Sequence, residues 1–501
     1  MLKIKLISKA LSINKLLLIS LLSFSYAQSF AQVFDVSFSP SIYNENFTGN
    51  IIMYLSKDNK EPKDGAVGVD LFPCFRKFVK NLKAGESVTI DDTAISYPTT
   101  ISNIERGEYY IQIVWDRNLG GRQISQSAGN LYSKTIKLNL TKNFTENFKI
   151  NATEIIPDSK PFKDTQYVKE LKAPSIFLSN FHKKPISVDA AVILPVEYYT
   201  EPQRKFPVLF IIFGYGADYR GVAGDNTPSV AVGEIPFIKV YLDGNCALGH
   251  SVYANSDNNG PWGDALVKEF IPMLEKKYRC NGANLLTGHS SGGWSSLWLQ
   301  TQYPKTFAGC WSSSPDPVDF ENFQEVDLYR QKNMFYNGKG ELNYMGTVAG
   351  RFPWMSMKNY YQMEKVIYRG EQMHSFNAVF SKKKSDGIAE NLVNDETGDI
   401  NQTVFPNWKK YDISSYLLKN WRNLKEDLEG KIRISAGNDD NFLLDKSVKL
   451  MEKKMKPLNI SVKFEYYNGD HFTVGTPEYK RDGYQFLKEK YLEWLKKNLK
   501  K

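Results

Sequence analysis

The chain has 501 residues and a formal net charge of +9, and 42% of its residues are hydrophobic. A chain of this length exceeds one average domain and can bury more than one hydrophobic core. The positive excess is weak, and the lysines are scattered without a basic and aromatic nucleic-acid motif, which argues against a nucleic-acid-binding protein.

The first 31 residues have the pattern of a secretory signal peptide. Four lysines precede a short apolar run at residues 16–24, and Ser29-Phe30-Ala31 offers a small-residue cleavage site, with Ser25-Tyr26-Ala27 as the alternative. A membrane anchor would need about 20 apolar residues, roughly twice the length of this run. Loss of the four leader lysines lowers the net charge from +9 to +5. We expect a periplasmic or secreted protein without a membrane span after cleavage.

Residues 32–150 consist of short alternating segments separated by turn residues, with no long helical stretch. Period-two alternation buries one face of each strand, so this region is predicted to be an antiparallel, immunoglobulin-like β-sandwich. The expected strands are residues 33–39, 49–55, 87–90, 109–115, 134–140 and 145–150. The region offers no obvious catalytic group, and a proline-containing linker at residues 151–170 follows it.

In residues 171–501 apolar strands alternate with amphipathic helices. Near-continuous apolar strands are typical of sheets covered on both faces, which predicts an α/β domain with a mostly parallel, doubly wound sheet. The expected strands are 187–194, 208–213, 237–242, 284–287, 307–312, 431–435 and 461–467, and the expected helices are 263–278, 291–302, 444–455 and 484–497.

The alternation stops at residues 316–420, which are irregular and rich in aromatic residues. A long insertion within a compact domain is usually a lid or a binding element. This one begins just after the expected strand 307–312 and ends before the expected strand 431–435, so we expect both of its ends near the carboxyl edge of the sheet, where such folds bind ligands. We predict a cap that selects the substrate.

A Gly-x-Ser-x-Gly motif lies between an expected strand and an expected helix, as Gly-His-Ser-Ser-Gly at residues 288–292. In this context the tight turn holds the serine in a strained conformation, and the hydroxyl projects at the helix N-terminus. The sequence therefore predicts Ser290 as a nucleophile. Gly249-His250-Ser251 begins in the same way, but Tyr253 at the fifth position prevents this turn.

A serine hydroxyl needs a positioned imidazole to take its proton, and in this fold the order along the chain is serine, acid, histidine. Of five histidines, His471 alone lies beyond the last plausible acid. The strand at residues 431–435 is followed by Asp439 and Asp440, and either is geometrically possible. A carboxylate there would accept the imidazole Nδ1–H and stabilise the imidazolium. We favour Asp440.

A tetrahedral intermediate needs two hydrogen-bond donors. One expected donor is the backbone N–H of Ser291, and the other comes from the Gly-Tyr-Gly loop at residues 214–216, where we choose the N–H of Tyr215. The glycines let the backbone approach the oxyanion, although turn formation would also explain them.

Several segments of the chain match a known family, namely Ala191-Val192-Ile193-Leu194-Pro195, Phe206-Pro207-Val208-Leu209, residues 288–293, the turn ending at Asp440 and Gly469-Asp470-His471. With these segments the chain from about residue 171 onward resembles the esterase D-like branch of the α/β-hydrolases, which includes feruloyl and acetyl-xylan esterases, S-formylglutathione hydrolase, enterochelin esterases and mycolyltransferases. The resemblance implies Ser290, Asp440 and His471 as the triad. Many members have His-Gly in the oxyanion loop, whereas this chain has Phe213-Gly214. Neither the sandwich nor the insertion is covered.

The prediction is an exported serine esterase that acts on a small-molecule or polysaccharide-linked acyl ester without a metal or another cofactor. Trp262, before the helix at 263–278, would line the pocket, and the insertion aromatics Phe352, Trp354, Tyr360 and Tyr361 would form an acyl or sugar-stacking wall. Core packing would explain these side chains equally well. A triad specifies acyl transfer but not the acceptor, so an acyltransferase or a peptidase stays open, as does a non-catalytic carbohydrate- or protein-binding module.

Overall fold

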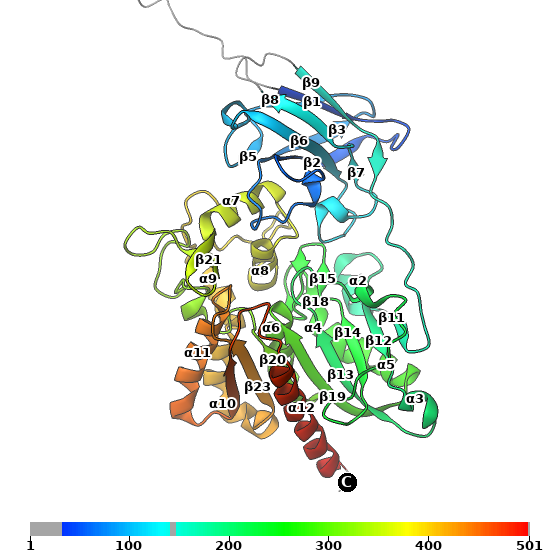
Figure 1. Cartoon of the computed structure of the whole chain (residues 1–501). Helices are drawn as coiled ribbons and strands as arrows, with labels where there is room; N and C mark the ends of the chain where they lie inside the picture. Colours follow the sequence, from blue (N-terminus) through cyan, green and yellow to red (C-terminus); the bar gives the residue numbers. More distant parts are fainter. Residues whose placement is uncertain (1–32, 141–146, 499–501) are drawn as a thin grey trace, which may run out of the picture.

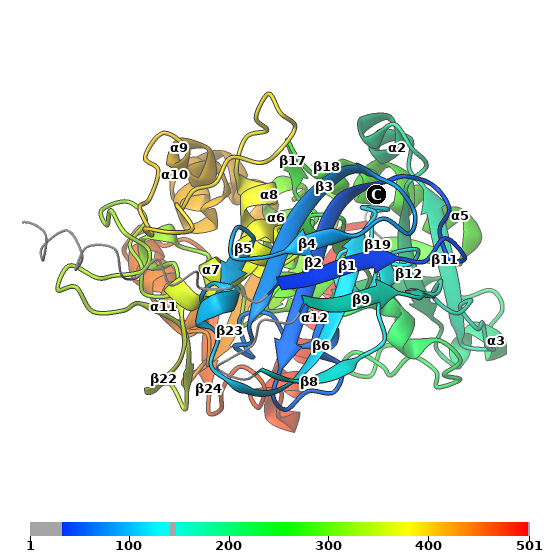
Figure 2. The same ribbon diagram turned by 90° about the horizontal axis from the view of Figure 1, so that it is seen from above.

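The structure is a computed structural model that describes residues 33–140 and 147–498, so the predicted signal peptide lies outside the described residues. An N-terminal β-rich part is followed by a larger α/β part (Figure 1). Seen from above, the β-rich part covers the middle of the α/β part (Figure 2). None of the helices in the described ranges combines the length and the hydropathy that a bilayer span requires.

The N-terminal part contains two packed sheets with the strand orders β4-β1-β9 and β10-β7-β6-β2-β3-β5, and β8 also pairs with β6. Phe38 and Phe47 pack against the ring of Trp115, each with centroids 5.0 Å apart, in the core between the sheets. Contrary to the antiparallel prediction, β1 and β9 are parallel. The strands are β1 Val33–Phe38, β2 Phe47–Ser56, β3 Cys74–Leu82, β4 Val88–Ile90, β5 Ile95–Tyr97, β6 Gly107–Asp116, β7 Leu131–Tyr132, β8 Ile136–Leu140, β9 Asn147–Ala152 and β10 Glu154–Ile155.

The predicted boundaries differ from the observed strand ends. Strand β10 still pairs with β7 of the sandwich, beyond the expected end at residue 150. Strand β11, Val168–Pro174, already pairs with β12 of the α/β sheet, before the expected start at residue 171. The connector between them lies along the α/β part, where the Lys163 carbonyl accepts from the Gly224 N–H at 2.9 Å.

The α/β part is built on an eight-stranded sheet with the order β11-β12-β14-β13-β19-β20-β23-β24. Strand β12 is antiparallel to both of its neighbours, and the strands from β14 to β24 are parallel. The sheet is therefore mixed at one end and parallel where the predicted site residues lie. The further strands are β12 Ser187–Ile193, β13 Phe206–Ile212, β14 Ile238–Leu242, β19 Cys280–His289, β20 Phe307–Ser313, β23 Ile432–Gly437 and β24 Val462–Tyr467.

Helices cover both faces of this sheet. Successive residues of a strand point to opposite faces, and in this sheet both sets of side chains pack against helices. Leu285 packs in a cluster with Phe486 of α12, whereas Leu286 packs with Leu274 of α5 and Leu299 of α6 on the other side. The helices are α5 Ile271–Lys277, α6 Ser291–Gln302, α10 Ile413–Leu428, α11 Leu444–Met455 and α12 Pro477–Asn498, with the short α2 Ile176–His182, α3 Glu197–Thr200 and α4 Trp262–Ala265.

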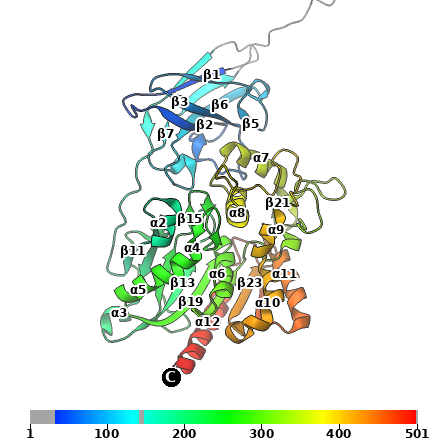
Figure 3. The same ribbon diagram turned by 180° about the vertical axis from the view of Figure 1, so that it is seen from behind.

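The insertion contains the hairpin β21–β22 (Tyr344–Val348 and Phe352–Ser356) and the helices α7 Met357–Ile367, α8 Gln372–Phe380 and α9 Phe405–Trp408. Helices α7 and α8 lie between the sandwich and the α/β part in opposite views (Figures 1 and 3). Met363, Val366 and Ile367 of α7 share a hydrophobic cluster with Ile52 and Tyr54 of the sandwich. The insertion therefore joins the two parts.

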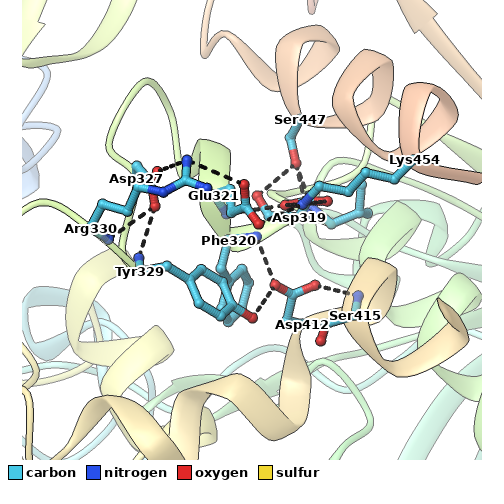
Figure 4. Close-up of polar contacts among 11 residues, drawn as sticks. Asp319, Phe320, Glu321, Asp327, Tyr329, Arg330, Asp412, Ser415, Ser447 and Lys454 are labelled. Carbon is cyan, nitrogen blue, oxygen red and sulfur yellow. Dashed lines mark hydrogen bonds and ion pairs between the residues drawn. The ribbon is translucent and has the colours of Figure 1, made fainter. Parts of the chain in front are cut away.

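The two ends of the insertion are fixed side by side by a buried polar cluster (Figure 4). At its start, Asp319 forms an ion pair of 2.8 Å with Lys454 of α11. At its end, Asp412 caps α10 by accepting from the Ser415 N–H at 2.8 Å, and it also accepts from the Phe320 N–H at 3.0 Å. The base of the insertion is thus anchored to the helices that flank β23.

Candidate active site

Ser290 occupies the turn between β19 and α6 and has φ 60° and ψ −128°, a backbone conformation that non-glycine residues rarely adopt. The flanking glycines are required sterically. A Cβ on Gly292 would lie 2.0 Å from the Ile212 carbonyl oxygen, and one on Gly288 would lie 2.2 Å from the Gly292 carbonyl oxygen. The close packing of β13, β19 and α6 therefore requires glycine at both positions, and the serine between them is half-buried.

The N-terminus of α6 points its free N–H groups at the same place. The first intrahelical bond from this turn runs from the Trp294 N–H to the Ser290 carbonyl at 3.0 Å, which leaves the N–H of Ser291 without a helical acceptor. The helix dipole also favours negative charge here. The loop after β13 lies beside it, since a Cβ on Gly214 would be 3.3 Å from the Ser290 Cβ. Both predicted oxyanion residues, Ser291 and Tyr215, are thus near Ser290.

His471 and Asp440 form a buried pair in which Nδ1 of the imidazole lies 2.8 Å from Oδ2 of the carboxylate. The other oxygen of Asp440 accepts from the Phe442 N–H at 2.9 Å. Of the two candidate acids, the structure brings Asp440 to His471 and leaves Asp439 exposed. A carboxylate in this position holds the Nδ1–H tautomer, which leaves Nε2 available to accept a proton.

The imidazole of His471 is packed between aromatic rings. Its centroid is 4.4 Å from that of His289 and 5.0 Å from that of Phe442, which it meets edge-on. Burial and the nearby His471 lower the pKa of His289 to about 4, so that His289 is neutral at neutral pH. Nδ1 of His289 lies 2.8 Å from the Ser313 hydroxyl, which fixes this ring.

A second carboxylate, which the sequence pattern marked only as the start of the insertion, lies beside the nucleophile. Asp316 follows β20, is 6% exposed, and accepts a hydrogen bond of 2.6 Å from the Ser291 hydroxyl. Burial raises the pKa of Asp316 to about 6, against the effect of hydrogen bonds from the Ser291 and Ser290 hydroxyls. Its position at the carboxyl end of a strand next to the elbow strand is the signal that could have identified it.

Ser290 and His471 face a common cavity of about 630 Å³. Three parts of the chain form its wall. The α/β part contributes Tyr215 and Phe442 among others; the insertion contributes Asp316, Gln324, Met345, Met355, Tyr360, Glu371, Gln372 and Phe376; and the sandwich contributes Asp64, Gly65, Ala66, Val67, Val69, Arg122, Gln123 and Gln126. The contribution of the sandwich was not predicted, because no sequence pattern reveals how two domains dock.

The structure does not bring Trp262, Trp354 or Tyr361 into this wall. Trp262 is buried against Tyr253 and donates to the Asn259 carbonyl at 2.9 Å, so it is a core residue. Tyr361 is buried against Phe335. Trp354 is 39% exposed and packs on the outer side of Phe442, with ring centroids 6.4 Å apart. Contrary to the prediction, these three side chains therefore do not line the cavity.

The family model described as "Putative esterase" matches residues 185–480. Among solved structures, a ferulic acid esterase has 15% identity and a TM-score of 0.35, and the match covers 64% of this chain and 95% of that one. An S-formylglutathione hydrolase from Agrobacterium tumefaciens has 13% identity, a TM-score of 0.38, and coverage of 66% and 96%. One from Staphylococcus aureus has 14% identity, a TM-score of 0.36, and coverage of 64% and 98%. A search of curated proteins finds no match.

Proposed function

Because the chain belongs to this esterase family and is a carboxylic ester hydrolase, we propose that it is an exported serine esterase working through an acyl-enzyme on Ser290. The observation that supports this most is the His471–Asp440 pair, with a Nδ1 to Oδ2 distance of 2.8 Å, in the same cavity as a serine held on a strained turn. Each group has a distinct role in the reaction.

In the first step the Ser290 hydroxyl attacks the ester carbonyl while Nε2 of His471 takes its proton. The carbonyl oxygen becomes an oxyanion, which the N–H groups of Ser291 and Tyr215 stabilise. The bond to the alcohol then breaks, and the imidazolium returns the proton to the leaving alkoxide. A water molecule, activated in the same way by His471, releases the acid and restores Ser290. Asp440 stabilises the imidazolium in both half-reactions.

The cavity suits an ester with an apolar acyl group and a polar partner. Met345, Met355 and Phe376 form an apolar part of the wall, whereas Gln123 and Gln126 are polar groups at the sandwich. We therefore propose a small-molecule or polysaccharide-linked acyl ester as the substrate class, because a concave apolar site with a few polar groups binds such ligands.

Hydrolysis of p-nitrophenyl esters of increasing acyl length tests this function. The purified protein should hydrolyse the short esters with a burst of one nitrophenolate per active site, and Ser290→Ala should lower turnover at least about 10⁴-fold without changing the melting temperature. Ser251→Ala is the matched control, because Gly249-His250-Ser251 repeats the start of the motif but Ser251 is fully buried elsewhere. Turnover by Ser290→Ala near the wild-type rate would exclude the proposal.

Export is proposed from the leader pattern of residues 1–31. When the full chain is expressed with a secretion pathway, N-terminal sequencing of the mature protein should start at Gln32, or at Gln28 for the alternative cleavage. An intact Met1 in the exported fraction would contradict a cleaved signal peptide.

A further inference from the structure

Arg122 of the sandwich reaches the side chain of Tyr215 in the catalytic cavity. Its guanidinium lies 4.6 Å from the centre of the Tyr215 ring, and Nη1 donates to the Tyr215 hydroxyl at 2.5 Å. The same nitrogen lies 3.1 Å from the Gly370 carbonyl of the insertion. One arginine therefore joins the sandwich, the loop after β13 and the insertion at a single point.

Tyr215 is held from the insertion side as well. Its hydroxyl hydrogen lies within reach of two acceptors, the Gly370 carbonyl at 2.7 Å and a Glu371 carboxylate oxygen at 2.9 Å. The backbones are also in direct contact here, because a Cβ on Gly370 would lie 2.0 Å from the Arg122 carbonyl oxygen. The ring of Tyr215 is thus fixed on its face and at its hydroxyl by groups from outside the α/β part.

This restraint acts on the loop that faces the nucleophile. Gly214 and Gly216 flank Tyr215, Gly216 has φ 84°, and such residues let a loop change conformation easily. A Cβ on Gly214 would lie 3.3 Å from the Ser290 Cβ, so the backbone of this loop is close to the nucleophile. A movement of the Tyr215 side chain would therefore shift its backbone N–H relative to the oxyanion.

We propose that Arg122 is a positioning residue for the oxyanion hole, so that the sandwich is a component of the catalytic unit. The inference rests on the proposed function, in which the Tyr215 N–H is an oxyanion donor. Attachment of the sandwich does not depend on Arg122, because the α7 cluster and the Asp116–Arg369 ion pair of 2.9 Å already join the parts. Arg122 adds contacts specifically at the catalytic loop.

A double-mutant cycle with Arg122→Ala and Tyr215→Phe tests the proposal. Each variant should lower kcat about 10- to 100-fold, because a displacement of about 1 Å at a catalytic group can cost 10²-fold, and should leave KM within about threefold. The double variant should lose less than the product of the two single losses, since both substitutions remove the hydrogen bond between Arg122 and the Tyr215 hydroxyl. Rates are normalised to the sites titrated by a fluorophosphonate, so that a loss of folded protein is not counted as a loss of kcat.

Arg117→Ala is the matched control. Arg117 also stacks on a tyrosine, with 4.4 Å to the ring centre of Tyr43, and donates to the Gly129 carbonyl at 3.1 Å, but all its partners lie in the sandwich. Its kcat should equal that of the wild type. Unchanged kcat in Arg122→Ala, a rise confined to KM, or additive effects in the cycle would overturn the positioning role. Failure of Ser290 itself to react would instead count against the proposed function.

Discussion

Arg369 of the insertion and Asp116 of the sandwich form a buried two-pronged ion pair, with Nη2 to Oδ1 and Nε to Oδ2 distances of 2.9 Å each. The side chain of Asp116 is completely buried and that of Arg369 is 4% exposed. Burial alone would raise the pKa of Asp116, but the hydrogen bond and charge of Arg369 lower it below its usual value. The two parts of the protein are therefore joined by a charge pair that water does not reach.

Asp116→Ala should destabilise the protein by about 3–5 kcal/mol, because it leaves the Arg369 guanidinium buried without a counter-charge. Chemical unfolding measures the difference. Arg481→Ala is the control, since its ion pairs lie on α12 and its side chain is 68% exposed, and it should cost less than about 1 kcal/mol. A cost for Asp116→Ala as small as that of the control would show that the pair contributes little.

Asp316→Asn should change how stability depends on pH. Burial raises the pKa of Asp316 to about 6 from the ordinary value of 3.8, so the folded protein holds this proton more tightly than the unfolded chain. The resulting stability is fully present below pH 3.8 and is lost as the pH rises through about 6. The variant cannot ionise at this position. Between pH 3.8 and about 6, the free energy of unfolding of the wild type should therefore fall by up to about 3 kcal/mol relative to that of the variant.

Unfolding titrations between pH 4 and 8 test this. A difference in hydrogen bonding between the substituted amide and the protonated carboxyl of Asp316 only offsets the two curves, whereas the growing gap between them reports the ionisation. Parallel curves across the whole range would contradict a raised pKa for Asp316.

Asp440→Asn should lower kcat by about 10⁴-fold, because an amide at this position cannot hold the required tautomer of His471 or stabilise its imidazolium. Asp439→Asn is the neighbouring control. Its kcat should stay within about twofold of the wild-type value, since the Asp439 side chain is exposed and the imidazole pairs with Asp440 instead. Steady-state kinetics on a p-nitrophenyl ester distinguish the two. The reverse ranking would move the acid to Asp439.

Met355→Ala should shift the preference among p-nitrophenyl esters toward longer acyl chains, because it enlarges the apolar part of the cavity wall by roughly three heavy atoms. One methylene in such a pocket changes discrimination by about 1–3 kcal/mol, so the change in relative kcat/KM should be about tenfold or more. Phe352→Ala, on the same strand but 67% exposed, should leave the profile unaltered. An unaltered profile in both variants would place the acyl group elsewhere.

The elements of the α/β part follow closely from the sequence. Helices α6 and α11 have the expected bounds, because helix starts and apolar periodicity are local signals. Strand β3 was not expected, since Arg76, Lys77 and Lys80 interrupt its apolar alternation, although Phe75 and Val79 are buried. The parallel pairing of β1 with β9 joins distant segments and has no local signature.

The residues of the site also divide into those that a sequence pattern identifies and those that depend on the tertiary structure. The order of serine, acid and histidine along the chain selected Asp440 and His471, which pair at 2.8 Å, and Ser290, which lines the same cavity as His471; their catalytic roles stay a prediction. Tyr360 and Tyr361 were both expected in the wall. Adjacent residues of a helix point about 100° apart, and of these two only Tyr360 lines the cavity. Arg122 could not have been found, because its role depends on how the sandwich docks.

Ser290 carries the acyl group in the proposed reaction, and mass spectrometry of the protein after treatment with a fluorophosphonate tests this most directly. Trypsin releases residues 280–305 as one peptide, and fragmentation separates Ser290 from its neighbour Ser291. We predict one adduct per chain, located on Ser290, which Ser290→Ala abolishes and His471→Ala slows by several orders of magnitude. An adduct on another residue, or none on an enzyme that still hydrolyses esters, would contradict Ser290 as the nucleophile.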